Sequence, residues 1–461
     1  MRTSTPSSAA APAETTQKDN ATMTSLAHDL HSLSFRLRAN LSAWHEHKGT
    51  NRRISRYSLH LTARRLRLPE WRFSHSMQAV TGLIAHHLSE TLPSSLTGLS
   101  SSWAEGGDSS SGGGANGNDG LQGAGAKTPL QRILSDVGRE LLNRVNESLA
   151  TFEQDYDNVR GDMYPMPWDM APIHRQNNPL FMLARTAQSV EEFVATLRRR
   201  VRGQAQPVWL SSSLYPQYYT KTYHYQTDGW LSDRSARIYE HNTEVLFLGR
   251  QDAMQRTSLL PIASYMREAA LAGRSPRDMK LLEVAAGTGR FHTFIKDAYP
   301  EMPSVVSDLS PFYLARARNN LNYWRALRQP GRRLGGVDDT GVTRFLQTAA
   351  EQIDGPDQEY DLVVCVYLFH ELPEAIRRRA ATEFFRVLKP GGMVVLTDSV
   401  QLGDRPSWDK SIGLFGDFNE PYYRNYVSCD LGAIFEEVGF MCDTKYLCSA
   451  TKTLSFRKPL E

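Results

Sequence analysis

The segment LLEVAAGTGR, residues 281–290, constrains the fold of this chain more than any other feature. A short apolar run ends at Glu283, a turn through Gly287 and Gly289 follows, and a helical pattern then begins. Glycine permits positive φ and lets a ligand approach the backbone closely. The N-terminus of the next helix offers free N–H groups and a positive dipole end, which suit a carboxylate. The segment therefore predicts a ligand-binding strand–turn–helix unit.

Short apolar runs alternate with helical patterns from this unit to the C-terminus. The runs are KLLEV, SVVSD, FLQTA, YDLVVCVYLF and MVVLTDS, separated by segments such as PFYLARARNNLNYW and EAIRRRAATEFFRVL. Continuous apolar strands alternating with helices indicate a mostly parallel sheet with helices on both faces. Ligands of such sheets lie beyond the carboxyl ends of the strands. The predicted fold class is α/β with a Rossmann-like sheet, preceded by a mainly helical N-terminal region.

The turn residues favour one kind of adenosine cofactor over another. A dinucleotide fingerprint G-x-G-x-x-G starting at Gly287 would need a third glycine where this chain has His292. Glu283 offers a carboxylate for an ammonium group, so an amino acid moiety fits better than a pyrophosphate. Asp308 closes the second apolar run, where an acid can accept hydrogen bonds from ribose hydroxyls. Asp308 could instead cap the next helix, although Ser310 can serve as that cap.

Three motifs in order resemble those of class I S-adenosylmethionine-dependent methyltransferases, notably the group related to ubiquinone/menaquinone C-methyltransferases. LLEVAAGTGR resembles the first motif of that family, E-x-A-x-G-T-G-R. YDLVVCVYLFHEL, residues 360–372, resembles the fourth-strand motif, and EFFRVLKPGGMVVLTD, residues 383–398, contains the R-V-L-K-P-G-G element. The resemblance covers roughly residues 230–460. It implies an enzyme that uses S-adenosyl-L-methionine as its cofactor.

The resemblance also implies roles for residues at the matching positions. The residues implied in cofactor binding are Glu283, Ala285, Gly287 and Gly289 around the methionine part, Asp308 at the ribose, Leu309, Ala350 and Glu351 at the adenine, and Tyr367 beside the sulfonium. The chain departs from the family where Asp-Ala-Glu is usual, because it has Ala349-Ala350-Glu351. The usual acceptor for the adenine amino group is therefore missing, and Glu351 or a backbone carbonyl must replace it.

Methyl transfer is an in-line displacement, so the enzyme must position the nucleophile and, where needed, remove its proton. The candidate bases are His370 and Glu371, which follow the fourth strand, and Asp398, which ends the fifth. Glu371 also suits the first turn of a helix. Clustered aromatic residues predict a lid over a flat or lipid-like acceptor such as a quinone, phenol or isoprenoid. The candidate substrate residues are Tyr223, His224, Tyr225, Tyr422 and Tyr423, which could alternatively pack their segments onto the sheet.

Composition restricts the compartment and the partners. The four cysteines form no C-x-x-C pair and have no histidine cluster beside them, so the sequence predicts neither a metal site nor a disulfide. No run of eighteen apolar residues occurs, so we expect no transmembrane segment. We expect a cytoplasmic protein, while the Ser-, Thr- and Ala-rich N-terminus leaves organellar targeting open.

The chain divides by composition into successive regions. These are a disordered tail (1–25), a helical N-terminal region (26–92), a Ser/Gly-rich flexible insertion (93–127), a helical region (128–204), an aromatic-rich lid with lead-in helices (205–272) and the methyltransferase domain (273–461). Ser189 and Glu192 form a capping-box pattern that predicts a helix start. A further helical stretch is expected from Ser232 to about Ala272.

The leading hypothesis is methyl transfer to a small aromatic or lipid-like acceptor, at carbon or oxygen. FNEPYY, residues 418–423, resembles an amino-N-methylation motif only superficially, because it follows the fifth strand rather than the fourth. One alternative is an RNA methyltransferase that uses the arginine-rich stretch of residues 46–72 to bind nucleic acid, although a solvated helical face explains that stretch equally simply. Another is a non-catalytic scaffold with the methyltransferase fold. The oligomeric state is left open.

Overall fold

The computed structural model describes residues 146–171, 173–203, 212–328 and 343–461. All of them belong to the second of two compact units of the chain, residues 73–461. The predictions for the N-terminal tail, the N-terminal helices, the Ser/Gly-rich insertion and the arginine-rich stretch lie outside the described residues.

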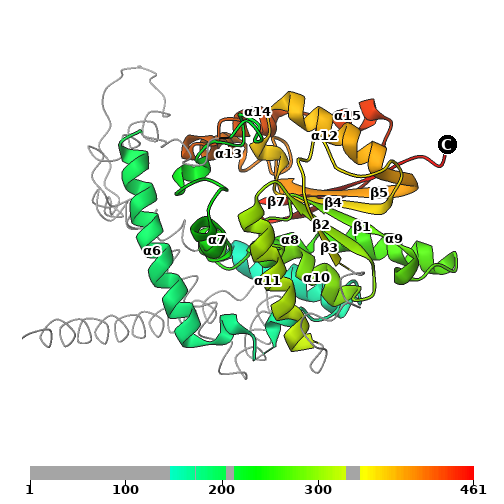
Figure 1. The fold of residues 1–461 in the computed structure, drawn as a ribbon, viewed down its shortest axis with the longest axis horizontal. Helices are drawn as coiled ribbons and strands as arrows, with labels where there is room; N and C mark the ends of the chain where they lie inside the picture. The colour runs from blue at the N-terminus through cyan, green and yellow to red at the C-terminus, as the bar shows by residue number, and fades with distance from the viewer. Residues whose placement is uncertain (1–145, 172, 204–211, 329–342) are drawn as a thin grey trace, which may run out of the picture. The chain divides into compact units, whose positions relative to one another are not determined.

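A seven-stranded sheet with the order β3-β2-β1-β4-β5-β7-β6 organises the described region (Figure 1). The strands are β1 (Leu281–Val284), β2 (Ser304–Asp308), β3 (Thr343–Gln347), β4 (Tyr360–Val366), β5 (Leu388–Ser399), β6 (Met441–Cys448) and β7 (Thr451–Arg457). Strands β1 to β5 pair in parallel, whereas β7 pairs antiparallel with both β5 and β6. The predicted Rossmann-like, mostly parallel sheet is confirmed. Its strand order reverses between β1 and β4, which is where ligands of such sheets bind.

Helices cover both faces of the sheet because successive strand residues point to opposite sides. Leu282 and Val363 join one apolar cluster with residues of α12 and α15, whereas Leu281 and Leu362 join another with residues of α9 and α10. Figure 1 shows α12 and α15 on one side of the sheet and α9 and α10 on the other. The bounds of these helices are Leu259–Leu271 for α9, Arg290–Ala298 for α10, Glu374–Val387 for α12 and Leu431–Val438 for α15.

The remaining helices connect the sheet to the lead-in segment and the C-terminal loops. Residues 146–160 are helical. The α-helices are α6 (Pro179–Val201), α7 (Asp233–Leu246), α8 (Gln251–Arg256), α11 (Pro311–Arg328), α13 (Asp409–Ile412) and α14 (Tyr423–Ser428). The 3₁₀ helices are η1 (Trp168–Met170), η2 (Arg175–Asn177), η3 (Tyr223–Tyr225), η4 (Pro276–Asp278), η6 (Phe369–Glu371) and η7 (Gly413–Phe418). The helical stretch predicted after Ser232 is present as α7, α8 and α9, and the Ser232 side chain caps α7.

The helix start predicted at Ser189 is wrong. Helix α6 begins at Pro179, because the side chain of Asn178 accepts hydrogen bonds from two backbone N–H groups and proline occupies the first helical position. Ser189 is buried inside α6. Glu192 lies beside it, and its carboxylate accepts hydrogen bonds from the N–H and hydroxyl of Thr227 instead of a cap. The Asn-Pro pair was the stronger start signal.

Two further findings concern the expected compartment. Across the described residues, no helix combines the length and hydropathy that a bilayer span requires. The four cysteines, all of them described, are unpaired: Cys365 and Cys448 are buried, whereas Cys442 is exposed.

Candidate active site

A cavity opens at the carboxyl ends of β1, β2 and β4, beside the point where the strand order reverses. It encloses about 1080 Å³, including its open mouth. The strand ends contribute Glu283, Ala285, Gly287, Asp308 and Tyr367 to its lining. Its other walls come from the lead-in segment, from α7 and α8, and from η6. This is the place where the fold predicts a ligand.

The turn after β1 holds the carboxylate of Asp308 at the cavity. Gly287 has a φ of +56°, and its N–H donates to Oδ2 of Asp308 at 2.8 Å, while the N–H of Ser310 donates to Oδ1 at 2.7 Å. Burial raises the pKa of Asp308 to about 6, against the effect of these backbone hydrogen bonds. The hydroxyl of Ser310 accepts from the N–H of Tyr313, so Ser310 also caps α11. Asp308 therefore faces the cavity as a buried carboxylate.

Glu283 is oriented by the histidine that replaces the third fingerprint glycine. The ring nitrogen Nδ1 of His292 lies 2.7 Å from Oε2 of Glu283, and Nε2 lies 2.9 Å from the hydroxyl of Ser304. Burial and the charge of Asp308 raise the pKa of Glu283, and burial lowers the pKa of His292. His292 is thus a fully buried bridge between α10 and the sheet, and it fixes the carboxylate that lines the cavity.

Unpaired polar atoms from α7 and α8 face the same cavity. Within the described residues, the side-chain oxygens Oε1 of Gln251, Oε1 of Gln255 and Oε2 of Glu244 are buried without a hydrogen-bond partner. Buried acceptors without partners cost free energy, so they indicate a ligand that carries N–H donors. Together with Glu283 they fit the ammonium group of an amino acid cofactor. Sequence reasoning missed these residues because the polar segment α8 reads as a surface helix. The spacing of the two glutamines, which places them on one face, was the signal available.

Four aromatic rings form one wall of the cavity. The ring centroid of Trp230 lies 5.8 Å from that of Tyr239 and 5.6 Å from that of Tyr313, and all three meet edge to face. Tyr219 completes the wall. Trp230 and Tyr219 belong to the segment 205–272, for which the sequence predicted an aromatic-rich lid. Tyr313 on α11 was missed, because in the sequence it looks like an ordinary apolar position of a helix.

At the adenine side of the predicted site, the carboxylate of Glu351 does not line the cavity. Ala349 and Ala350 line the cavity where the related family has aspartate and alanine. The hydroxyl of Tyr218 donates to Glu351, with both carboxylate oxygens at 2.8 Å, and Tyr218 itself lines the cavity. The carboxylate of Glu351 is therefore held by a residue of the lead-in segment and is not part of the lining.

The predicted cofactor residues line the cavity, with the exceptions of Gly289 and Glu351. Gly289 has a φ of +67°, and a Cβ there would come within 2.8 Å of the Cβ of Ala317 on α11. The structure therefore gives Gly289 a packing role between α10 and α11. The cofactor roles of the individual residues stay predictions.

Among the candidate bases, only Glu371 lines the cavity. Nδ1 of His370 lies 2.6 Å from Oδ1 of Asp398. The same carboxylate accepts a hydrogen bond from the N–H of Ser399 at Oδ1 and from the N–H of Phe369 at Oδ2. Burial acts to lower the pKa of His370, but the charge of Asp398 and this hydrogen bond outweigh it and raise the pKa to about 10. His370 is then protonated at neutral pH and cannot accept a proton. Burial and the charge of Glu420 raise the pKa of Glu371 as well, so Glu371 is favoured only by its place in the cavity lining.

The predicted substrate residues lie behind the cavity wall rather than in its lining. The hydroxyl of Tyr223 donates to the backbone carbonyls of Tyr218 and Glu371, at 2.7 and 3.2 Å. Tyr422 accepts a hydrogen bond from Lys221, and Tyr423 packs against His370. His224 contacts Glu420, and the carbonyl of Tyr225 accepts from Arg199. In this structure these residues connect the segments that carry the wall.

The strand order, the glycine turn after β1 and the acid at the end of β2 agree with the methyltransferase fold that the sequence motifs predict. In agreement, residues 281–392 match the family model described as a methyltransferase domain.

Two relatives with similar sequences carry methyltransferase names. A demethylmenaquinone methyltransferase of Deinococcus radiodurans is 31% identical over 152 residues, which is 32% of this chain and 55% of that protein. An uncharacterized methyltransferase of Synechocystis is 24% identical over 168 residues, or 36% of this chain and 69% of that protein. The chain thus spans about half the length of the Deinococcus relative.

Solved structures give weaker likenesses. An O-methyltransferase family protein from Burkholderia thailandensis has a TM-score of 0.38 at 14% identity, covering 60% of this chain and 71% of that one. A SAM-dependent methyltransferase from Aquifex aeolicus has a TM-score of 0.30 at 18% identity, covering 44% and 92%. These scores do not establish a shared fold, so the fold assignment rests on the strand order.

Proposed function

We propose that this protein transfers a methyl group from S-adenosyl-L-methionine to a carbon or oxygen atom of a small aromatic or lipid-like acceptor. The observation that carries the proposal is the shared cavity, in which Glu283 and Asp308 face the same space as the aromatic wall and Glu371. Its mixed polar and aromatic lining suits a nucleoside cofactor next to a flat acceptor. The name of the Deinococcus relative, demethylmenaquinone methyltransferase, supports a quinone-like acceptor.

Each side of the cavity has a separate task in this proposal. Glu283, with the unpaired oxygens of Gln251 and Gln255, holds the ammonium of the methionine part, and Asp308 accepts from the ribose hydroxyls. Leu309 and Ala350 flank the adenine, and Tyr367 lies beside the sulfonium. When bound, S-adenosylmethionine supplies the methyl group, which passes to the acceptor with release of S-adenosylhomocysteine and a proton.

A labelling experiment tests the activity and separates the alternatives. The full chain is incubated with methyl-labelled S-adenosylmethionine and, separately, with quinones, phenols, isoprenoids and RNA. We expect label in a small aromatic or isoprenoid acceptor, and no label when Asp308 is replaced by alanine. Label in RNA would instead favour the RNA methyltransferase hypothesis, whose basic segment lies outside the described residues. Failure of the chain to bind S-adenosylmethionine would favour a scaffold.

We also propose that the protein works in a reducing, cytoplasm-like compartment. Four unpaired cysteines support this, because exposed and partly buried thiols tend to oxidise or pair elsewhere. Thiol titration of freshly purified protein under denaturing conditions should find all four free.

A further inference from the structure

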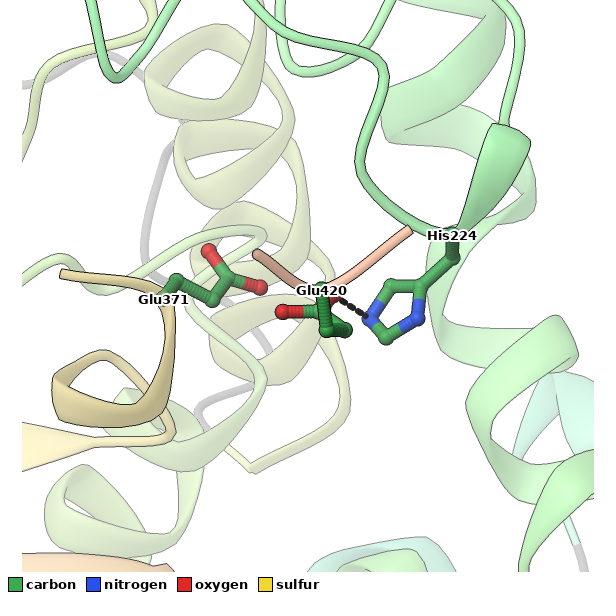
Figure 2. A group of neighbouring side chains, drawn as sticks. All are labelled: His224, Glu371 and Glu420. Atoms are coloured by element: carbon green, nitrogen blue, oxygen red, sulfur yellow. Dashed lines mark ion pairs between the residues drawn. The ribbon is translucent and has the colours of Figure 1, made fainter. Parts of the chain in front are cut away.

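Three side chains that come from distant parts of the sequence meet beside the cavity (Figure 2). His224 lies in η3, Glu371 in η6, and Glu420 in the loop after η7. One nitrogen or oxygen atom from each lies within 4.8 Å of the others. Nε2 of His224 is 2.7 Å from Oε1 of Glu420, and Figure 2 shows the Glu420 carboxylate between the other two side chains.

The carboxylate of Glu420 lacks the partners that burial requires. Its side chain is 0% exposed, Oε1 has only the ion-pair contact with His224, and Oε2 has no hydrogen-bond partner among the described residues. Glu371 has one ion-pair partner, Nε2 of His370 at 3.8 Å. In the part of the chain that the structure describes, no lysine or arginine pairs with either carboxylate. Two buried carboxylates this close cost free energy unless protons or a cation balance them; His370 lies beside Glu371, whereas Glu420 has only His224.

Hydrogen bonds hold the backbone around the three side chains, and two residues there have positive φ. His224 has a φ of +54°, and Asn419, the residue before the third side chain, has a φ of +63°. Nδ2 of Asn419 donates to the carbonyl of Thr222 at 2.5 Å, and the hydroxyl of Tyr223 donates to the carbonyl of Glu371. Left-handed backbone at non-glycine residues persists where surrounding contacts fix it, and it is concentrated at functional sites. These bonds tie together the three segments that carry the cluster.

We propose that His224, Glu371 and Glu420 bind a first-row divalent cation, Mn²⁺ or Zn²⁺, beside the part of the cavity that Glu371 lines. One imidazole and two carboxylates form a mixed nitrogen and oxygen ligand set that suits these ions. Three protein ligands leave a coordination position open, as in catalytic zinc sites. Glu371 also lines the cavity, so it connects the proposed cation position to the cavity, while His224 and Glu420 lie outside the lining. Resting on the proposed function, the cation binds an oxygen atom of the methyl acceptor.

An ion pair between His224 and Glu420 is the simpler explanation, and it makes different predictions. It leaves the second oxygen of Glu420 without a partner, and it gives no reason for Glu371 to approach. If the pair were only structural, Glu420→Gln would lower the melting temperature and cations would have no effect. If the cluster is a cation site, Glu420→Gln relieves repulsion with Glu371 and raises the melting temperature of the metal-free protein.

The test is calorimetric titration of Mn²⁺ into the EDTA-stripped full chain, repeated with Zn²⁺. Mn²⁺ comes first because thiols such as the exposed Cys442 compete for Zn²⁺. We expect one cation bound per chain and a higher melting temperature in its presence. Glu420→Gln should weaken binding at least about tenfold. Asp417→Asn is the matched control, because it removes one charge from the neighbouring η7 at a side chain that pairs with Arg424, and it should bind like the wild type.

Two outcomes would overturn the proposal: no binding of either ion to the wild type, or unchanged binding by Glu420→Gln. His224→Asn repeats the test if Glu420→Gln does not fold, since asparagine tolerates positive φ and the imidazole is partly exposed. Titration of S-adenosylmethionine into the same samples tests the proposed function separately from the proposed cation site. Cofactor binding without cation binding overturns only this inference, and cation binding without cofactor binding overturns only the proposed function.

Discussion

The two sides of the cavity are built in different ways. The cofactor side is built around one stretch of the chain, in which Glu283 lies in β1, Gly287 in the turn after it and Asp308 at the end of β2. Backbone N–H groups hold Asp308, and His292 holds Glu283. The acceptor side joins segments that are far apart in sequence, and side-chain hydrogen bonds to backbone carbonyls, such as that of Tyr223, tie them together. The cofactor side is thus a local motif, whereas the acceptor side exists only in the folded chain. Substitutions on the two sides should therefore affect stability, cofactor affinity and KM for the acceptor differently.

The largest effect is expected where the cofactor side packs most tightly. In Gly289→Ala the new Cβ would lie 2.8 Å from the Cβ of Ala317 and 3.1 Å from its Cα, at a φ of +67°. Positive φ and overpacking together should lower the free energy of unfolding by about 2–4 kcal/mol. Urea unfolding measures this directly.

Gly273→Ala is the control for that change. Gly273 also has positive φ, +76°, but a Cβ there meets nothing within 4 Å, so only the backbone cost of about 1 kcal/mol is expected. The double variant Gly289→Ala/Ala317→Gly should recover only the part of the loss that contact with the Cβ of Ala317 causes, because the backbone cost at position 289 remains and glycine inside α11 adds its own. If Gly289→Ala and Gly273→Ala lowered the free energy of unfolding equally, contact with α11 would not be the reason for glycine at position 289.

The next largest effect concerns the carboxylate of the cofactor side. Asp308→Ala removes the proposed ribose acceptor and the acceptor of the Gly287 N–H. We expect S-adenosylmethionine binding to weaken at least tenfold, about 1.4 kcal/mol. Calorimetric titration measures the affinity, with Asp233→Ala, an exposed acid paired with Arg237, as the control. An affinity that stays within twofold of wild type would remove Asp308 from the binding site.

The same carboxylate predicts a pH dependence. Because burial raises the pKa of Asp308 to about 6, the group ionises only as the pH rises through that value. The ionised form accepts from ribose hydroxyls most strongly, so affinity should fall as the pH drops below 6. At pH 5 about one tenth of the carboxyl is ionised, and binding should be about tenfold weaker than at pH 7.5. Asp308→Asn should show a flatter profile between these pH values. A wild-type affinity that does not change over this range would contradict the assignment.

The sequence predicted the local side of the molecule well. Strands β1, β4 and β5 contain apolar runs, and the glycine turn and Asp308 follow short apolar runs, so periodicity and the family resemblance located them. The capping pattern at Ser189 failed, because Asn178 and Pro179 start the helix earlier and Glu192 is used in a tertiary contact. Local patterns succeed when local contacts determine the structure.

The acceptor side could not be predicted in the same way. The same limit applies on the cofactor side to Gln251 and Gln255, which look like surface residues until the folded chain shows that they are buried against the cavity. Glu420 appeared within FNEPYY, whose position after β5 gave no reason to place it beside His224 and Glu371. Burial of a polar group and the meeting of three distant segments depend on tertiary structure, which neither spacing nor composition encodes directly.

The smallest effect should come from loosening the acceptor side without touching the cavity lining. Tyr223→Phe removes the hydroxyl that donates to the carbonyls of Tyr218 and Glu371 but keeps the buried ring. We expect about 1 kcal/mol less stability, since buried carbonyls lose a donor. S-adenosylmethionine affinity should stay within twofold, while KM for the acceptor identified by labelling rises a few-fold. The variant removes only hydrogen bonds of the acceptor side. A fall in cofactor affinity that matches the rise in KM would therefore show that the structures of the two sides depend on each other.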